Sequence, residues 1–119
     1  MNIIVADDDK VLSQMLCGIL RESGHKPMPA FDAMQVMMFA MRQSPDLVLL
    51  DISMPGGTGL DVLRKLKTNS KTANVPVIII TGSTDQKLPD EVLKLGASKF
   101  LSKPIDPDVL MEAVKSVGV

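Results

Sequence analysis

The chain has 119 residues, the length of one ordinary domain, which we place at residues 1–119. Lys and Arg total 13 against 14 Asp and Glu, and this net charge of −1 lacks the basic excess of proteins that bind nucleic acids directly. No apolar run approaches the roughly 20 residues that cross a bilayer, the first residues do not resemble a signal sequence, and the single Cys17 excludes an intrachain disulfide, so we expect a cytoplasmic protein without a membrane partner.

Hydrophobic patterning predicts strands that alternate with helices along the whole chain. The strands are short apolar runs bounded by Asp, Gly or Pro, and the helices carry apolar residues at helical spacing. In chain order we expect a strand at 2–6, a helix from 11 to 23, a strand at 25–30, a helix from 33 to about 43, a strand at 47–50, a helix around 60–66, a strand at 75–80, a short helix that ends at Gly96, a strand at 99–101 and a last helix that Asp106 and Pro107 begin. This order predicts an α/β fold with a parallel sheet, right-handed crossovers and helices on both faces.

Particular residues refine the ends of these elements. Asp9 and Asp32 are placed to cap the first two helices. Pro27 and Pro29 remove two N–H donors from the second strand, which we therefore expect at an edge of the sheet.

The third and fourth helices have unusual beginnings. Thr58 supplies a hydroxyl cap for the third helix. Pro89 lacks an N–H group and disfavours helical backbone at Leu88, so the fourth helix should begin near Pro89 and leave residues 82–88 as a long loop.

Polar residues follow four of the predicted strands, and the carboxyl ends of parallel strands meet at one edge of a sheet. This rule brings together Asp7, Asp8, Asp51, Thr81 and Lys103. Several carboxylates in one pocket repel each other unless a cation neutralises them, and Mg²⁺ (or Mn²⁺) prefers such oxygen ligands. A metal ion, a Lys and a Thr around one Asp is an arrangement suited to phosphoryl transfer.

Several short motifs surround these polar residues: IVADDD at residues 4–9, PDLVLLDISMP at residues 45–55, Gly59, PVIIITG at residues 76–82, Gly96-Ala97 and FLSKP at residues 100–104. In these motifs the sequence resembles the receiver domains of two-component response regulators, in particular the single-domain receivers of chemotaxis and sporulation. The resemblance spans the whole chain and implies a doubly wound, flavodoxin-like (βα)5 fold with strand order 2-1-3-4-5.

The resemblance implies a role for each acidic position. Asp51 would accept the phosphoryl group. Asp8 and the Asp51 carboxylate would bind Mg²⁺ directly, Asp7 would act mostly through water, and the backbone carbonyl of Ser53 would complete the protein ligands.

It also implies roles for residues near the ends of the last two strands. Lys103, the Thr81 hydroxyl and the backbone of Gly82 would contact the phosphoryl group, and the Lys103–Pro104 bond would be cis. Phosphorylation would draw Thr81 inward, and the rotamer of Phe100 would follow it and change a binding surface. The implied partners are a histidine kinase or histidine phosphotransfer protein and a downstream protein effector, and a weak homodimer remains open.

Three other functions would also fit parts of this sequence. A phosphohydrolase with an Asp nucleophile needs a second acid two residues on, where this chain has Ser53. A nucleotide- or flavin-binding module needs a Gly-rich or hydroxyl-rich loop after the first strand, where this chain has three aspartates. An interaction module that takes no phosphoryl group stays open as the alternative, although the presence of Asp7, Asp8, Asp51, Thr81 and Lys103 together argues against it. Turnover of a separate substrate is not expected.

The second predicted helix carries more apolar residues than one buried face requires. Val36 and Ala40 belong to a core stripe, while Met34, Met38 and Met41 form a second stripe. The second stripe is either an exposed patch for a partner or a dimer contact, or part of a loosely packed core.

Overall fold

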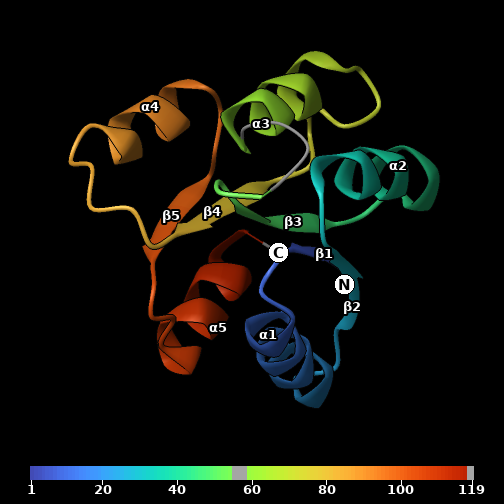
Figure 1. Ribbon diagram of the computed structural model, residues 1–119. Helices are drawn as coiled ribbons and strands as arrows, with labels where there is room; N and C mark the ends of the chain where they lie inside the picture. Colours follow the sequence, from blue (N-terminus) through green and yellow to red (C-terminus); the bar gives the residue numbers. More distant parts are fainter. Residues whose placement is uncertain (55–58, 118–119) are drawn as a thin grey trace.

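The structure, a computed structural model, describes residues 1–54 and 59–117, and its five parallel strands lie in the order β2-β1-β3-β4-β5 (Figure 1). The elements are β1 (Asn2–Ala6), α1 (Lys10–Glu22), β2 (Lys26–Ala30), α2 (Ala33–Gln43), β3 (Leu47–Asp51), α3 (Gly59–Thr68), β4 (Val77–Thr81), α4 (Leu88–Lys94), β5 (Lys99–Ser102) and α5 (Pro107–Val117). The predicted fold class and strand order are confirmed. None of the helices in the described part of the chain is both long and apolar enough to span a membrane.

Helices cover both faces of the sheet, with α1 and α5 on one side and α2, α3 and α4 on the other (Figure 1). Successive side chains of a strand point to opposite faces, so each central strand feeds two cores. On β1, Ile3 and Val5 pack in the α1–α5 core, and Ile4 and Ala6 pack in the core under α2, α3 and α4. Burial on both faces explains the continuous apolar runs of β1, β3 and β4.

Strand β2 lies at an edge of the sheet, as its two prolines predict. The Lys26 N–H donates to the carbonyl of Met1, and the carbonyl of Ala30 accepts from Asp7 N–H, so residues 26, 28 and 30 face β1. Pro27 and Pro29 therefore stand at the positions that face outward, where a missing N–H costs no bond within the sheet.

Two strands begin later than the sequence predicts. His25 is not in β2, because its N–H donates to the carbonyl of Leu20 and closes the end of α1. Strand β4 begins at Val77 instead of residue 75, because the Val75 N–H donates to Thr72 in a turn and Pro76 has no N–H to offer.

The predicted helix caps are present where the structure describes them. The Asp9 carboxylate accepts the N–H groups of Val11 and Leu12 at 3.0 and 3.1 Å, and Asp32 accepts that of Gln35 at 2.8 Å. These bonds satisfy donors that a helix leaves free at its first turn. The cap predicted at Thr58 lies outside the described residues.

Helix α4 begins late, as Pro89 predicts. Its first residue is Leu88 and Pro89 follows, while the residue before the helix, Lys87, makes no side-chain cap. The loop between β4 and α4 covers residues 82–87, one residue fewer than predicted, because Leu88 is already helical although Pro89 follows it.

The second methionine stripe of α2 is exposed at Met34 and Met38 and half-buried at Met41. The side chains of Met34 and Met38 are 79% and 38% exposed, and Met41 is half-buried, whereas Val36 and Ala40 are buried. The core therefore uses one face of α2 and leaves the Met34/Met38/Met41 stripe at the surface. Whether a partner covers this stripe stays a prediction.

Replacing Met34 by Gln is accordingly expected to change the free energy of unfolding by less than about 0.5 kcal/mol, because the side chain makes little contact with the core. Val36→Ala, on the buried face of the same helix, should cost more than about 1 kcal/mol. Urea unfolding of the two variants beside the unmodified protein checks this contrast. An equal loss of stability in both would mean that Met34 is packed.

Candidate functional site

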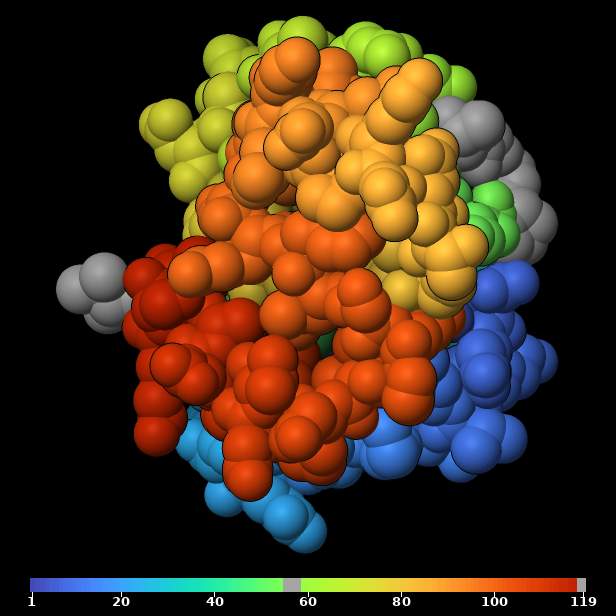
Figure 2. All heavy atoms as spheres, turned by 90° about the vertical axis from the view of Figure 1, so that its left-hand side faces the viewer, coloured from blue at the N-terminus to red at the C-terminus, as the bar shows by residue number. Residues whose placement is uncertain are grey.

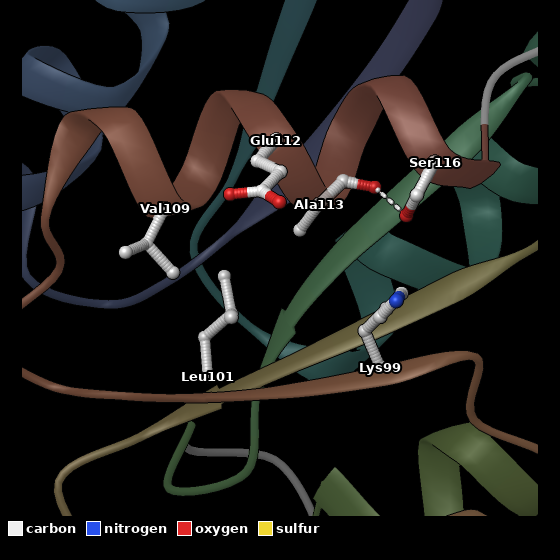
Figure 3. Close-up of a pocket in the computed structure, with 6 residues that line it drawn as sticks. All are labelled: Lys99, Leu101, Val109, Glu112, Ala113 and Ser116. Carbon is white, nitrogen blue, oxygen red and sulfur yellow. Dashed lines mark hydrogen bonds between the residues drawn. The ribbon is translucent and has the colours of Figure 1, made fainter.

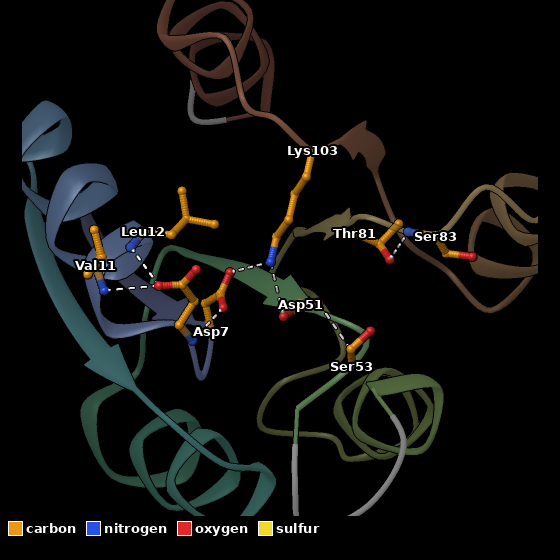
Figure 4. A network of polar contacts seen from close by, with 9 residues as sticks. Asp7, Val11, Leu12, Asp51, Ser53, Thr81, Ser83 and Lys103 are labelled. Atoms are coloured by element: carbon orange, nitrogen blue, oxygen red, sulfur yellow. Dashed lines mark hydrogen bonds and ion pairs between the residues drawn. The ribbon is translucent and has the colours of Figure 1, made fainter.

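The ends of four strands bring their polar residues to one place, as the parallel sheet requires (Figure 4). Asp7 and Asp8 directly follow β1, Asp51 ends β3, Thr81 ends β4, and Lys103 directly follows β5. The predicted meeting of these side chains at the carboxyl edge of the sheet is therefore present in the structure.

Three carboxylates form the acidic part of the site. One carboxylate oxygen from each of Asp7, Asp8 and Asp51 lies within 4.8 Å of the others. Asp7 and Asp51 are 0% and 2% exposed, while Asp8 is exposed and forms the side of the cluster that solvent reaches. Buried carboxylates at this separation repel each other, so the site requires positive charge.

Lys103 supplies that charge in this structure. Its ammonium nitrogen lies 2.9 Å from Asp7 Oδ2 and 3.3 Å from Asp51 Oδ2, and its side chain is 24% exposed (Figure 4). The Lys103 N–H donates to the carbonyl of Thr81 at 2.8 Å, which fixes the start of the side chain next to β4. The peptide bond between Lys103 and Pro104 is cis.

Both buried carboxylates are oriented by their own backbone. Asp7 Oδ1 accepts the N–H of Asp9 at 2.9 Å, and Asp51 Oδ1 accepts the N–H of Ser53 at 3.0 Å. Each is a hydrogen bond to the residue two positions on, the pattern of an Asx turn. Because these bonds occupy Oδ1, both aspartates direct Oδ2 toward the same cation.

Burial and neighbouring charges shift the pKa values of Asp7 and Lys103. Burial raises the pKa of Asp7, more than the Asp9 N–H and the Lys103 ammonium lower it, and the charge of Asp51 adds to the rise. Burial also disfavours the Lys103 ammonium, but the two carboxylates outweigh that effect and raise the pKa of Lys103. The site therefore holds a Lys that stays charged and an Asp that is costly to ionise.

The residues present fit a hard divalent metal ion. Asp7 Oδ2 is buried and, apart from its ion pair with Lys103, has no hydrogen-bond partner in the described part of the chain. A buried oxygen of this kind, grouped with two other carboxylates and with no His or Cys ligand, suits Mg²⁺ or Mn²⁺.

Thr81 is fully buried beside this cluster, and its Oγ1 accepts the N–H of Ser83 at 3.1 Å (Figure 4). A hydroxyl that accepts in this way still has its hydrogen to donate. Phe100 is half-buried and packs against the core under α2, α3 and α4. Its role as a switch, and the phosphoryl contacts of Gly82 and the Ser53 carbonyl, stay predictions.

Three residues contribute to the site in ways that were not predicted. The backbone N–H groups of Asp9 and Ser53 orient the Asp7 and Asp51 carboxylates, and the sequence signal for this is an Asp at the end of a strand that is followed by a turn. The third residue is Gly59, whose backbone passes so close to Ile52 that a Cβ there would lie 2.3 Å from the Ile52 Cα. The small size of residue 59 thus lets α3 begin directly behind the end of β3.

A separate groove lies between β5 and α5, on the face of the molecule that Figure 2 shows. It measures about 210 Å³, and the side chains of Leu101, Val109 and Ala113 face one another inside it (Figure 3). Lys99, Glu112 and Ser116 complete its lining. None of these residues belongs to the predicted phosphoryl-transfer site.

Comparisons with known proteins agree on one family. The family model for the response regulator receiver domain matches residues 3–115 of the chain. The chain is 31% identical to the phosphate regulon transcriptional regulatory protein PhoB of Escherichia coli, over 97% of this chain and 50% of PhoB. It is 38% identical to the DNA-binding response regulator MtrA of Mycolicibacterium paratuberculosis, over 96% of this chain and 49% of MtrA. The chain thus spans about half the length of these relatives.

The fold matches solved structures as well. A CheY-like response regulator receiver domain protein from Methanospirillum hungatei superposes with a TM-score of 0.90 at 25% identity, over 97% of this chain and 90% of that one.

Proposed function

Because the chain belongs to the response regulator receiver domain family, we propose that it accepts a phosphoryl group on Asp51 and reports it through a protein-interaction surface. The observation that carries this proposal is the buried Asp51 carboxylate, held within 4.8 Å of the Asp7 and Asp8 carboxylates and 3.3 Å from the Lys103 ammonium. The phosphoryl donor is a histidine kinase or a histidine phosphotransfer protein.

The chemistry is an in-line displacement at phosphorus. An oxygen of Asp51 forms the new P–O bond while the P–N bond to the donor histidine breaks, and the electron pair of that bond returns to the imidazole nitrogen. Asp8, Asp51 and the carbonyl of Ser53 would hold Mg²⁺ or Mn²⁺ directly, and Asp7 would act mostly through water. When bound, the ion would offset charge on the transferring group.

The remaining residues act on the oxygens of the phosphoryl group. The Lys103 ammonium, which contacts Asp7 and Asp51 in this structure, would pair with one of these oxygens. The hydrogen of the Thr81 hydroxyl and the N–H of Gly82 donate to the others. No substrate is turned over apart from the phosphoryl group on Asp51 itself, which water later removes.

Residues 1–119 report phosphorylation through contact with a protein effector. The relatives PhoB and MtrA are named as a transcriptional regulatory protein and a DNA-binding regulator, but this chain spans only half of each. A net charge of −1 gives these residues no excess of positive charge for binding a polyanion directly.

Intact-protein mass spectrometry tests the proposal. Incubation with acetyl phosphate and Mg²⁺ should add the mass of one phosphoryl group to the unmodified protein and to Asp108→Asn, an exposed aspartate of α5. Asp51→Asn should show no gain, because an amide is a poor nucleophile, and chelation of the metal should abolish the gain in every sample.

No gain in the unmodified protein, with Mg²⁺ present and the fold intact by circular dichroism, would overturn the proposal in favour of an interaction module that takes no phosphate. A gain that persists in Asp51→Asn would place the phosphoryl group on a different residue.

A further inference from the structure

Helix α2 is unusually rich in methionine. The chain has 9 Met among 119 residues, and four of them fall within the 11 residues of this helix: Met34, Met37, Met38 and Met41. Helix α2 contains no Leu, whereas α1, α3, α4 and α5 each contain Leu. A leucine would serve an apolar helix face equally well, so the sequence of α2 favours sulfur at positions where the other helices use hydrocarbon.

Burial in the core does not account for these methionines. Val36 and Ala40 are the buried residues in the middle of α2, and of the four methionines Met37 packs against the same core. Met34 and Met38 are 79% and 38% exposed. A side chain that stays in water adds little to folding, so the thioethers of these two residues are open to a ligand from solvent.

The helix brings three of the sulfurs to one stripe. With 3.6 residues per turn, positions 34, 38 and 41 lie within a sector of about 60° around the axis of α2. Residues three and four positions apart have their Cβ atoms about 5–6 Å from each other. The side chain of Met has three rotatable bonds, so sulfurs at this spacing can converge on a single small ion. Met37 stands next to the stripe and can supply a fourth sulfur.

A thioether selects the kind of ion that it binds. Its sulfur is neutral and soft, which suits Cu⁺, whereas Mg²⁺ and Ca²⁺ prefer oxygen ligands. The single thiol of the chain, Cys17, is only 3% exposed in the α1–α5 core, and burial raises its pKa, which disfavours the thiolate that binds metals. A soft cation that reaches the folded protein therefore meets the thioethers of α2 more readily than this thiol.

We propose that the Met34/Met38/Met41 stripe is a thioether site for a soft monovalent cation of the Cu⁺ class. None of these residues belongs to the phosphoryl-transfer site, so the inference does not depend on the proposed function.

Titration calorimetry with Ag⁺ tests the site, because Ag⁺ has the soft character of Cu⁺ and keeps one oxidation state in air. In a nitrate buffer without chloride, the unmodified protein should bind one Ag⁺ on this stripe. The double variant Met34→Leu/Met38→Leu keeps the apolar surface and a good helix former, and it should weaken the affinity by more than about tenfold because two of three sulfurs are lost. The matched control is Met15→Leu, at a methionine of α1 that is 44% exposed, and its affinity should be unchanged.

NMR of the methionine methyl groups locates the ion. Added Ag⁺ should shift the methyl signals of Met34, Met38 and Met41 and leave that of the buried Met54 in place, and an equal amount of Zn²⁺ should shift none of them. Cys17→Ala should bind Ag⁺ as the unmodified protein does, with circular dichroism as the check that each variant is folded.

Three results would overturn the proposal. Full affinity in the double variant would show that the stripe does not hold the ion. An equal loss of affinity in Met15→Leu would show scattered binding to any exposed methionine. Loss of binding in a folded Cys17→Ala would place the ion on the thiol.

Discussion

Replacing Lys103 by Met is expected to lower the free energy of unfolding of the metal-free protein by about 2–4 kcal/mol near neutral pH. The Met side chain keeps most of the packing but removes the only cation within 3.3 Å of the Asp7 and Asp51 carboxylates among the described residues. Two buried negative charges then face each other without compensation. We place the loss below that of a fully buried ion pair because the Lys103 side chain is 24% exposed.

The pH dependence of this loss follows from the pKa values of the two groups. Burial raises the pKa of Asp7 in the folded protein above its value in the unfolded chain. Ionised Asp7 therefore lowers the free energy of unfolding at a pH above the folded-state pKa, and protonation on acidification removes this loss. The raised pKa of Lys103 means that its contribution is complete below its ordinary pKa and is lost only as alkaline pH passes the raised value.

Removal of the ammonium should raise the pKa of Asp7 further. The deficit of Lys103→Met should therefore be largest near neutral pH and shrink as acidification protonates Asp7. Urea unfolding at several pH values in the presence of a chelator measures it. Lys115→Met, at an exposed position of α5, is the control and should stay within about 0.5 kcal/mol of the unmodified protein. A deficit that does not change with pH would mean that packing, and not charge, is what Lys103 provides.

Gly59→Ala should be comparably damaging, for a steric reason. The added Cβ would lie 2.3 Å from the Cα, 2.8 Å from the carbonyl oxygen and 2.9 Å from the carbonyl carbon of Ile52. These are backbone atoms, so no side-chain rotation relieves the overlap, and α3 must move away from the end of β3. We expect a loss of about 2–4 kcal/mol in unfolding free energy.

Gly18→Ala is the matched control because the same methyl group meets no atom within 4 Å there. Gly18 lies inside α1, where alanine is the better helix former, so this variant should gain about 0.5–1 kcal/mol. Thermal and urea unfolding of the pair measure both effects. Equal stability of the two variants would contradict the close approach of Gly59 to Ile52.

The arrangement of strands and helices could be predicted because burial on both faces leaves a strong pattern, as in the fully buried β3 (Leu47–Asp51). The starts of β2 and β4 could not, because they depend on which carbonyl each amide reaches. The His25 N–H closes α1 and the Val75 N–H closes a turn, and apolar pattern carries no record of either bond.

The members of the site were predictable for a different reason: the topology alone brings Asp7, Asp51 and Lys103 to one edge of the sheet. Their orientation was not, because it depends on hydrogen bonds between a side chain and the backbone two residues on. Such bonds require particular rotamers of Asp or Ser, residues that also occur in many loops without making them.

The prolines of β2 also limit how copies of this protein can associate. An open-ended fibre built by joining sheets would need the outer edge of β2 in one copy to pair with β5 of the next. The outward positions of β2 are Pro27 and Pro29, which have no N–H to donate, so this head-to-tail contact is blocked at each copy. Pairing through β5 alone joins two copies and then stops, so edge-to-edge growth ends at a closed pair.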